Sequence, residues 1–293
     1  MKKFPMLSLL ALIMASVAQA ATLGSDNTSS SAYSDGWQNG DNGGAGFGPW
    51  TLNTTGTTNG TGTGGSTFSG QYLGTSTVLT GTTPNINSPT NSFGIYAKIA
   101  SQSSNNNAAA FSSAYRNFDT GSLGIGQTFT IQIAVNFRNG QKGFELQSGN
   151  AAGLAGSAIF TFKAFDSGAG DGYYIRNDTT YFPQDTPFSV SGNPAAGGYS
   201  NNTVFTLSFT QISASVGNFS IARSGGLSGT MTGQYAGLAG GFKLFAQSTQ
   251  SSDENNFFFN SLAVIPEPSA VGAAISAGLA LIVLLRRRKT GLV

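Results

Sequence analysis

The clearest structural signal in this sequence is Thr128-Phe129-Thr130-Ile131-Gln132-Ile133-Ala134-Val135-Asn136-Phe137. Large apolar residues alternate there with small or polar ones, which is the two-residue period of a strand with one buried face. The turn dipeptide Asn139-Gly140 follows and leads into Gly143-Phe144-Glu145-Leu146-Gln147. The sequence therefore predicts a hairpin between these two segments.

Similar short apolar segments recur along the chain, separated by clusters of Gly, Ser and Asn, and no segment between residues 21 and 265 shows a helical period. This pattern predicts an all-β fold, an antiparallel β-sandwich of jelly-roll type. Residues 53–67 carry no apolar side chain except threonine methyls, so they predict a long loop or an irregular edge. Further strands are expected near Trp50 and at residues 93–97, 114–118, 159–165, 172–176, 203–210, 218–223, 241–246 and 256–264.

The beginning of the chain has the parts of a secretory signal. Met1-Lys2-Lys3 is a positive region, residues 7–17 form a short apolar core, and Ala18-Gln19-Ala20 is an A-x-A cleavage site. We therefore expect residues 1–20 to be a removed signal peptide. Residues 21–263 are then one exported β-sandwich domain, and residues 264–293 form a C-terminal tail.

The tail has three parts in sequence. The motif Pro266-Glu267-Pro268 precedes an uncharged apolar span at residues 269–285, which as a helix reaches about 25 Å, near the lower limit for crossing a bilayer. A basic cluster then stops the crossing and stays on the cytoplasmic side, which places the preceding chain outside. This cluster consists of Arg286, Arg287, Arg288 and Lys289.

This tail resembles the PEP-CTERM sorting signal of exported bacterial proteins, in the order and the spacing of its parts. The resemblance covers about a tenth of the chain. It implies recognition by a membrane-embedded exosortase after export through the Sec translocon, cleavage near residues 266–268, and sorting to the cell surface or extracellular matrix. The alternative is a C-terminal membrane anchor that is never cut.

Composition excludes several kinds of function. The chain contains no Cys and no His, which excludes Ser-His-Asp and Cys-His catalysis, imidazole or thiolate zinc sites, and haem held by His or Cys. Residues 21–265 hold eight Lys and Arg against eleven Asp and Glu, a formal charge of −3. Because no basic stripe neutralises phosphates, we expect no nucleic-acid partner.

One acidic, aromatic loop is a candidate ligand site. Trp37 and Trp50 could stack against sugar rings beside Asp35, Asn39 and Asp41, and the same oxygens could hold Ca²⁺, although the spacing of an EF-hand is absent. The competing interpretation makes both tryptophans buried anchors at one end of the core. No other cofactor is expected.

The strand-rich mature region also resembles the concanavalin-type and laminin-G-type sandwiches of lectins, with an Asn-bearing final strand at residues 255–260. The resemblance implies glycan or Ca²⁺ sites in loops rich in Asp and Asn, here residues 166–172 and 251–255. The alternative for both loops is an ordinary turn with solvated carboxylates.

Catalysis is not expected. Glycoside hydrolysis needs two carboxylates about 5 to 10 Å apart, and the only glutamates before residue 265 are Glu145, interpreted as a solvated residue on a strand face, and Glu254 in a loop. We expect a non-enzymatic surface or matrix protein that associates with exopolysaccharide. A specific carbohydrate-binding module and a glycoside hydrolase or polysaccharide lyase are the alternatives.

Overall fold

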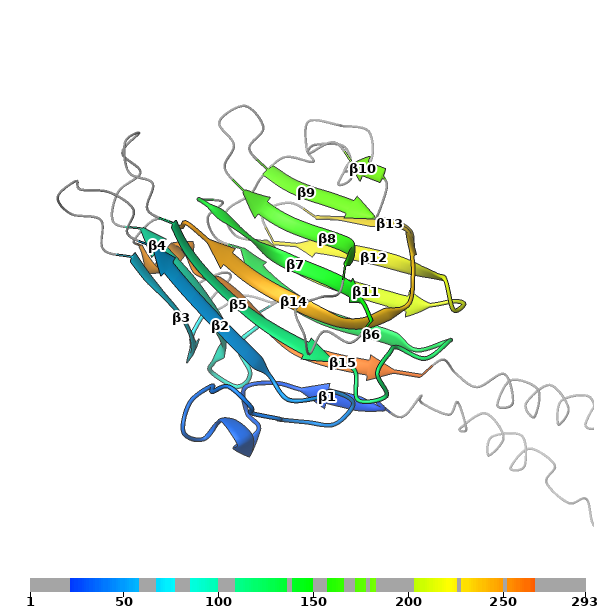
Figure 1. Cartoon of the computed structure of the whole chain (residues 1–293), viewed down its shortest axis with the longest axis horizontal. Coiled ribbons are helices and arrows are strands. Elements are labelled where there is room, and N and C mark those ends of the chain that lie inside the picture. Colours follow the sequence, from blue (N-terminus) through cyan, green and yellow to red (C-terminus); the bar gives the residue numbers. More distant parts are fainter. Residues whose placement is uncertain are drawn as a thin grey trace, which may run out of the picture.

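Two antiparallel sheets lie face to face in this computed structural model (Figure 1). Their apolar side chains meet between them. The predicted all-β, antiparallel sandwich is thus confirmed. The predicted signal peptide and most of the tail, residues 267–293, lie outside the described residues. The structure describes residues 22–57, 67–76, 85–99, 109–135, 139–149, 157–165, 172–177, 180–182, 203–225, 228–249 and 252–266.

The first sheet has the strand order β13-β12-β11-β6-β15-β4-β3, and β1 pairs with β15 beside this row. Its central strand β6 is the segment with the clearest alternation in the sequence. The bounds are β1 (Gly24–Asp26), β3 (Thr67–Gly74), β4 (Ser92–Ile99), β6 (Thr128–Val135), β11 (Thr203–Gln211), β12 (Val216–Ser224), β13 (Gly229–Ala236) and β15 (Phe257–Ile265).

The second sheet has the order β10-β9-β8-β7-β14-β5-β2. Two 3-10 turns, η1 (Ser31–Tyr33) and η4 (Asp253–Asn255), lie in the connections. The strands are β2 (Thr51–Thr57), β5 (Ala109–Asn117), β7 (Gln141–Ser148), β8 (Ala158–Phe165), β9 (Gly172–Asn177), β10 (Thr180–Phe182) and β14 (Ala239–Gln247).

The core between the sheets is rich in aromatic rings. Phe129 of β6 stacks on Phe242 of β14 with 4.8 Å between the ring centroids, and both side chains are fully buried. Phe144 of β7 stacks on Phe209 of β11 at 5.2 Å. Each pair joins one sheet to the other, so stacked rings hold together a chain that has no disulfide available.

The predicted hairpin between residues 128–137 and 143–147 is wrong. The strand β6 pairs with β11 and β15 in the first sheet, whereas β7 pairs with β8 and β14 in the second. Gly140 does adopt the positive φ of a turn, at 69°. The two strands lie in opposite sheets, and each directs alternate apolar residues into the core between them. The alternation shows that one face of a strand is buried, but it does not show which strand is its neighbour.

The strands that the sequence left out lie mostly at the ends of the sheets. The strands β3, β13 and β10 are terminal in their sheets, and β1 adds three residues beside β15. The region predicted as loop or irregular edge, residues 53–67, also needs correction. Residues 53–57 continue the terminal strand β2, residue 67 begins β3, and residues 58–66 lie outside the described part.

No helix within the described part of the chain is long and apolar enough to cross a membrane. The predicted transmembrane span at residues 269–285 lies outside that part. Pro266, the first residue of the predicted sorting motif, directly follows the last strand, β15.

Candidate functional site

The tryptophans of the candidate loop lie inside the sandwich. Trp37 is 5% exposed and Trp50 is 1% exposed, and their ring centroids are 5.2 Å apart in an edge-on contact. Trp37 also lies 4.9 Å from the ring of Phe93 and 5.6 Å from that of Phe259. Neither indole presents a face to a sugar, and this burial fits the interpretation of both tryptophans as core anchors.

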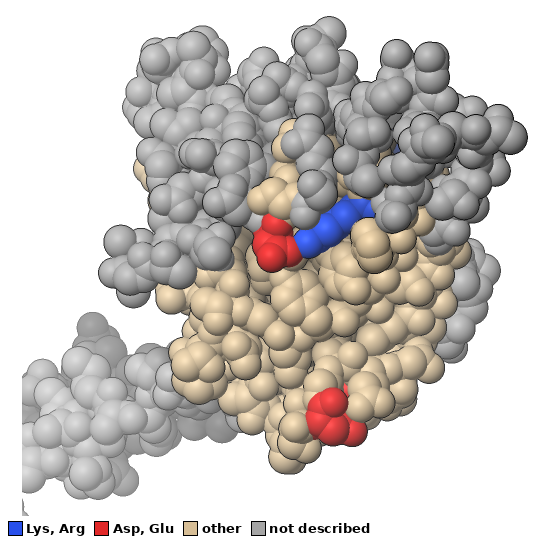
Figure 2. All heavy atoms as spheres, turned by 90° about the vertical axis from the view of Figure 1, so that its left-hand side faces the viewer, with Lys and Arg blue, Asp and Glu red and all other residues tan. Residues whose placement is uncertain are grey.

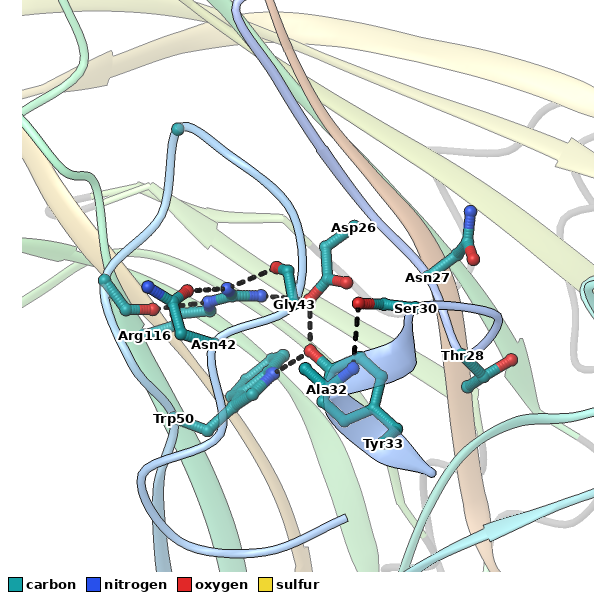
Figure 3. Close-up of polar contacts among 12 residues, drawn as sticks. Asp26, Asn27, Thr28, Ser30, Ala32, Tyr33, Asn42, Gly43, Trp50 and Arg116 are labelled. Atoms are coloured by element: carbon teal, nitrogen blue, oxygen red, sulfur yellow. Dashed lines mark hydrogen bonds and ion pairs between the residues drawn. The ribbon is translucent and has the colours of Figure 1, made fainter. Parts of the chain in front are cut away.

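A buried polar network lies beside Trp50 (Figure 3). Arg116 of β5 forms an ion pair with Asp26 of β1, and both side chains are 0% exposed. The hydroxyl of Tyr33 donates to the Asp26 carboxylate, and Trp50 Nε1 donates to the Tyr33 hydroxyl at 3.0 Å. Burial raises the pKa of the Asp26 carboxyl, while Arg116 and Tyr33 oppose that rise. The network contains no solvent-accessible charge.

The guanidinium of Arg116 also holds the N-terminal segment against the second sheet. Its Nη2 donates to Asn42 Oδ1 at 2.7 Å and to the Gly43 carbonyl at 2.8 Å, and its Nε donates to the Gly48 carbonyl at 2.7 Å. It lies 4.9 Å from the ring of Phe47 and from that of Trp50. Four of its five N–H donors bind groups of the protein, and such a fully buried arginine has a structural role.

The remaining residues of the loop serve its turns. Asp41 Oδ2 accepts from the Gln38 amide at 2.7 Å, and Asn39 Oδ1 accepts from the Leu52 amide at 2.9 Å. The Asp35 carbonyl accepts from the Gln38 side chain at 3.3 Å. Among the residues that the structure describes, no three acidic, Cys or His side chains converge as they would around a metal ion.

The other two candidate loops are described only in part. Residues 166–171 and Ser251 lie outside the described residues. Asp253 forms an ion pair with Lys98 of β4, and the Asn255 carbonyl accepts from Lys142 of β7 at 2.6 Å. Asn255 Oδ1 accepts from Asn139 at 2.9 Å. The described part of the loop therefore ties the two sheets together.

A groove of about 320 Å³ lies on the outer face of the second sheet. Its lining combines charged groups from Glu145, Lys163, Arg176 and Lys243, amides from Gln141 and Gln247, and aromatic rings from Phe111 and Phe245. These residues come from five neighbouring strands, β5, β14, β7, β8 and β9 (Figure 1). The described lining of the groove therefore belongs to strands of one sheet.

Strand register aligns the polar residues in a row across the sheet. Residues directly opposite each other on antiparallel strands share a face, so their side chains are neighbours. The first row runs from Tyr115 to Lys243, Glu145, Thr161 and Arg176. A second row, offset from the first by two residues along each strand, places Phe245 beside Gly143 and Gly143 beside Lys163.

An ion pair lies at the centre of the groove. Lys243 Nζ is 2.5 Å from Glu145 Oε2, and the two side chains are 17% and 18% exposed. Gln147 Nε2 also donates to Glu145 Oε2, at 3.3 Å. Lys243 Nζ lies 5.3 Å from the ring centroid of Phe245 and 5.9 Å from that of Tyr115, so the ammonium makes a cation–π contact with each ring.

Lys163 lies on the β8 side of this ion pair. Its Nζ donates to Gln141 Oε1 at 3.4 Å. Burial lowers the pKa of Lys163, and the carboxylate of Glu145 acts in the opposite direction. A further negative group brought to this ammonium would favour its charged form.

Charged residues gather in the described lining of the groove. Its described lining holds three cations and one carboxylate, whereas residues 21–265 carry a formal charge of −3. On the face drawn in Figure 2, most of the described surface belongs to neither acidic nor basic residues. Three of the eight basic residues between 21 and 265 thus meet in one place on a surface with few charges.

The sequence alone does not predict this groove. Glu145 was interpreted as a solvated residue on a strand face, and it does lie on the outer face of its strand, but it is paired with Lys243. The available signal was the polar residue between apolar neighbours in segments such as Phe162-Lys163-Ala164 and Phe242-Lys243-Leu244. This signal does not predict the groove, because the sequence does not show which strands are neighbours in the sheet.

Comparisons with known proteins give no family. No protein-family model matches the chain, and no curated protein matches it. Among solved structures, the globular domain of T. cruzi calreticulin is similar with a TM-score of 0.39 and 8% identity, over 76% of this chain and 95% of that one. An endo-β-1,4-glucuronan lyase from Trichoderma reesei gives 0.33 and 8%, over 73% and 93%. A galectin from Caenorhabditis elegans gives 0.26 and 12%, over 49% and 84%.

Similarities of this size carry no argument about ligand or activity. The function must be argued from the chain's own residues, and above all from the groove.

Proposed function

We propose that this chain is an exported, non-catalytic surface or matrix protein that binds a polysaccharide in the groove of its second sheet. The observation that carries the proposal is the row of polar side chains from Tyr115 to Arg176, which crosses five strands. At a strand spacing of about 4.8 Å, such a row is about 19 Å long. This length exceeds a single sugar ring and suits several units of a polymer.

The chemistry of the lining supports a sugar ligand. Amides of Gln141 and Gln247 and the hydroxyl of Thr161 can each donate and accept, as sugar hydroxyls do. Phe111 and Phe245 add apolar ring surface to the same groove, against which the C–H faces of sugars pack. Polar groups fixed on strands hold their positions without a ligand, so little ordering is needed on binding.

The non-catalytic part of the proposal is supported by the number of acids in the groove. Glycoside hydrolysis uses two carboxylates that flank the scissile bond. Among the described lining residues, Glu145 is the sole carboxylate, and Lys243 neutralises it. A hydrolase is therefore a poorer interpretation than a binding protein.

Export and sorting complete the proposal. The signal peptide at residues 1–20 would direct the chain to the Sec translocon, and the tail would hold it in the bacterial membrane until an exosortase cuts near Pro266, Glu267 and Pro268. The product would then reach the cell surface or matrix. The PEP-CTERM-like tail and the jelly-roll or concanavalin-like pattern of the sequence support this part, and Pro266 directly follows β15, at the end of the sandwich.

The binding proposal is tested by affinity electrophoresis of the full-length chain in detergent, through gels cast with a panel of bacterial, plant and algal polysaccharides. We expect retardation by at least one polymer, and less retardation for Lys243→Gln, because that change removes a charged side chain of the row. Lys98→Gln, a change outside the groove, should migrate as the parent does. Uniform mobility across the panel would contradict the proposal. Parallel gels with Ca²⁺ test the alternative of calcium-dependent binding.

The sorting proposal is tested by mass spectrometry of protein extracted from the cell surface. Peptides from Ser269 to Val293 should be missing from mature molecules. An intact C-terminus in most of them would contradict cleavage and leave the uncut anchor. Deletion of Arg286 to Lys289 should weaken membrane retention, as measured by protease protection in intact spheroplasts.

A further inference from the structure

We propose that one end of the sandwich is a lipid-docking face, on which exposed aliphatic side chains enter the headgroup region of the bilayer that holds the tail. At this end, called the tail end below, β1 and β6 begin and β11 and β15 end. The inference rests on the membrane-held stage of the proposed function and names the surface that faces the lipid. The connections considered at the tail end are residues 22–23, 118–127, 212–215, 237–238 and 266.

Exposed apolar side chains gather at the tail end. Five large apolar side chains are exposed in the described part of the chain, and four of them lie in these connections. They are Ile125, which is 69% exposed, Leu23, Ile212 and Leu238. The fifth, Phe68 of β3, is at the other end of the sandwich, near the end of β4. Single exposed apolar residues are normal, whereas four at one end indicate a surface that meets an apolar partner.

A buried glutamine fixes three of these residues relative to one another. Gln211, the last residue of β11, is fully buried. Its backbone carbonyl accepts from the Gly126 amide at 2.7 Å, and its side chain donates to the Gly237 carbonyl at 3.0 Å. The exposed residues that directly adjoin these three positions in the chain are Ile125, Ile212 and Leu238.

The tail leaves the sandwich beside the same residues. Ile265, at the end of β15, is opposite Thr128 of β6, which in turn is opposite Thr210 of β11. At a strand spacing of about 4.8 Å, the start of the tail lies about 10 Å from the end of β11. Leu23 is also near the tail, because its amide donates to the Val264 carbonyl at 2.8 Å. Figure 1 shows β1 beginning and β15 ending on the same side of the sandwich.

The length of chain beyond the sandwich sets its height above the bilayer. Residues 267 and 268 separate Pro266 from the uncharged span at residues 269–285. The three Cα–Cα steps from 266 to 269 reach at most about 11 Å. The polar layer on each side of the hydrocarbon core is about 5 to 8 Å thick. When the span is inserted, the tail end lies at the level of the headgroups or a few ångströms above them.

The charges of the tail end fit apolar docking. Among the residues of its connections given above, Asp119 carries the only charge, and its carboxylate accepts from the Gly46 amide at 2.9 Å. An end without cations has little attraction for anionic lipid, so apolar contact must supply the binding. A second copy is a poorer occupant. Copies held in one bilayer by the same tail have the same orientation, so their tail ends all face the lipid and cannot meet each other.

The test uses the absence of Cys from the chain, which lets one introduced cysteine carry a fluorescent label. Full-length variants are reconstituted in phosphatidylcholine vesicles whose lipid carries a nitroxide quencher near the headgroup. Ile125→Cys, Ile212→Cys and Leu238→Cys report on the tail end, and Phe68→Cys is the matched control at the other end. We expect the tail-end labels to be quenched roughly threefold more than the control label. Leu279→Cys, read with a quencher deep in the acyl chains, establishes whether the span is inserted.

A second set of variants changes the docking face itself. Ile125→Asp combined with Ile212→Asp should reduce quenching of the Leu238→Cys label roughly threefold, because charged groups resist entry into the interface. Phe68→Asp should leave that quenching unchanged. Addition of phosphatidylglycerol to the vesicles should also leave it unchanged, since the connections of the tail end carry no cation. Urea denaturation of each variant establishes that it is folded.

The outcomes separate this inference from the proposed function. Tail-end labels quenched no more than the Phe68→Cys label, with the span inserted, would overturn the inference and leave the proposed function standing. A span that is not inserted would overturn the membrane-held stage of the proposed function together with the inference. Quenching that requires phosphatidylglycerol would overturn the apolar basis of docking. Shielding of the labels that rises with the density of protein in the membrane would assign the face to a second copy and overturn lipid docking.

Discussion

Two ion pairs lie on opposite faces of the same sheet and differ in almost everything else. Arg116 of β5 and Lys243 of β14 belong to paired strands, in which Arg116 is opposite Phe242 and Lys243 is opposite Tyr115. Arg116 points between the sheets to Asp26, with both side chains fully buried, whereas Lys243 points outwards to Glu145 and keeps partial contact with solvent. A one-residue difference in register thus separates a charge that holds the fold from a charge that can meet a ligand.

The comparison also teaches how a chain with so few charges uses them. Inside, Arg116 is fully buried beside aromatic rings and carbonyl groups, and four of its N–H groups donate to the protein. Outside, Lys243 and Glu145 form the middle of a polar row. We expect changes to the inner pair to affect stability, and changes to the outer pair to affect binding.

The largest effect is expected for Asp26→Asn. The change leaves Arg116 buried without its counter-charge, which costs about 3–5 kcal/mol of unfolding free energy. Urea denaturation measures it. The matched control is Glu145→Gln, the same type of chemical change on the outer face. Equal losses in the two variants would mean that burial does not distinguish the pairs.

A pH effect is expected from a second buried cation, Lys142 of β7, which is fully buried. Burial lowers its pKa to about 7 from an ordinary value of 10.5. Between these values the unfolded chain binds the proton more strongly than the folded chain does, so stability rises with pH. From about pH 7 to pH 9.5 the gain is at most about 3 kcal/mol.

Denaturation of the parent and of Lys142→Met at several pH values tests this slope, which should flatten in the variant. Measurements stay below pH 10, because buried tyrosines such as Tyr72, whose pKa burial raises to about 12, oppose folding at higher pH. The lowered pKa of Lys163 should leave a small residual slope of the same sign. A variant slope as steep as that of the parent would contradict the role of Lys142.

A smaller effect on stability is expected for Glu145→Gln, below about 1 kcal/mol, because the outer pair is partly solvated. The same change removes one charged group of the polar row, so it should also reduce retardation in the polysaccharide gels. Affinity electrophoresis checks this, and unchanged retardation would contradict a role of Glu145 in the groove.

The smallest effect is expected for Lys98→Met. Its partner Asp253 has a side chain that is 87% exposed, and its hydrogen bond and ion pair with Lys98 lower the carboxyl pKa. Exposed pairs contribute little, so the change in unfolding free energy should stay within about 0.5 kcal/mol. A loss close to that of Asp26→Asn would show that exposure does not decide the strength of ion pairs in this sandwich.

The sequence predicted the interior of the sandwich better than its borders. Strands such as β6 and β11 lie between two neighbours and bury one face more than the other, so their sequences alternate. The terminal strand β13 reads Gly-Thr-Met-Thr-Gly-Gln-Tyr-Ala and buries only Met231 and Tyr235. A strand that buries few side chains has few large apolar residues to alternate with polar ones. The alternation in the sequence therefore does not predict β13.

The site was harder to predict than the fold, for a different reason. The pairing of Trp37 with Trp50 inside the core follows from the general tendency of tryptophan to be buried. Asp26 gave no signal, because its partner Arg116 is ninety residues away in the chain. The groove likewise depends on which strands are neighbours, and the wrong hairpin between residues 128–137 and 143–147 shows that alternation alone does not reveal it.

The pairing of β1 with β15 has a mechanical consequence. β15 lies along β6 on one edge, and on its other edge it meets β4 at residues 257–259 and β1 at residues 262–264. The Leu23 amide also donates to the Val264 carbonyl at 2.8 Å. A pull on the chain beyond Pro266 therefore loads hydrogen bonds on both edges of an interior strand at once, in shear. The end of the sandwich that leads to the tail is thus a firm point of attachment, while a polymer held on the second sheet would pull from the opposite layer.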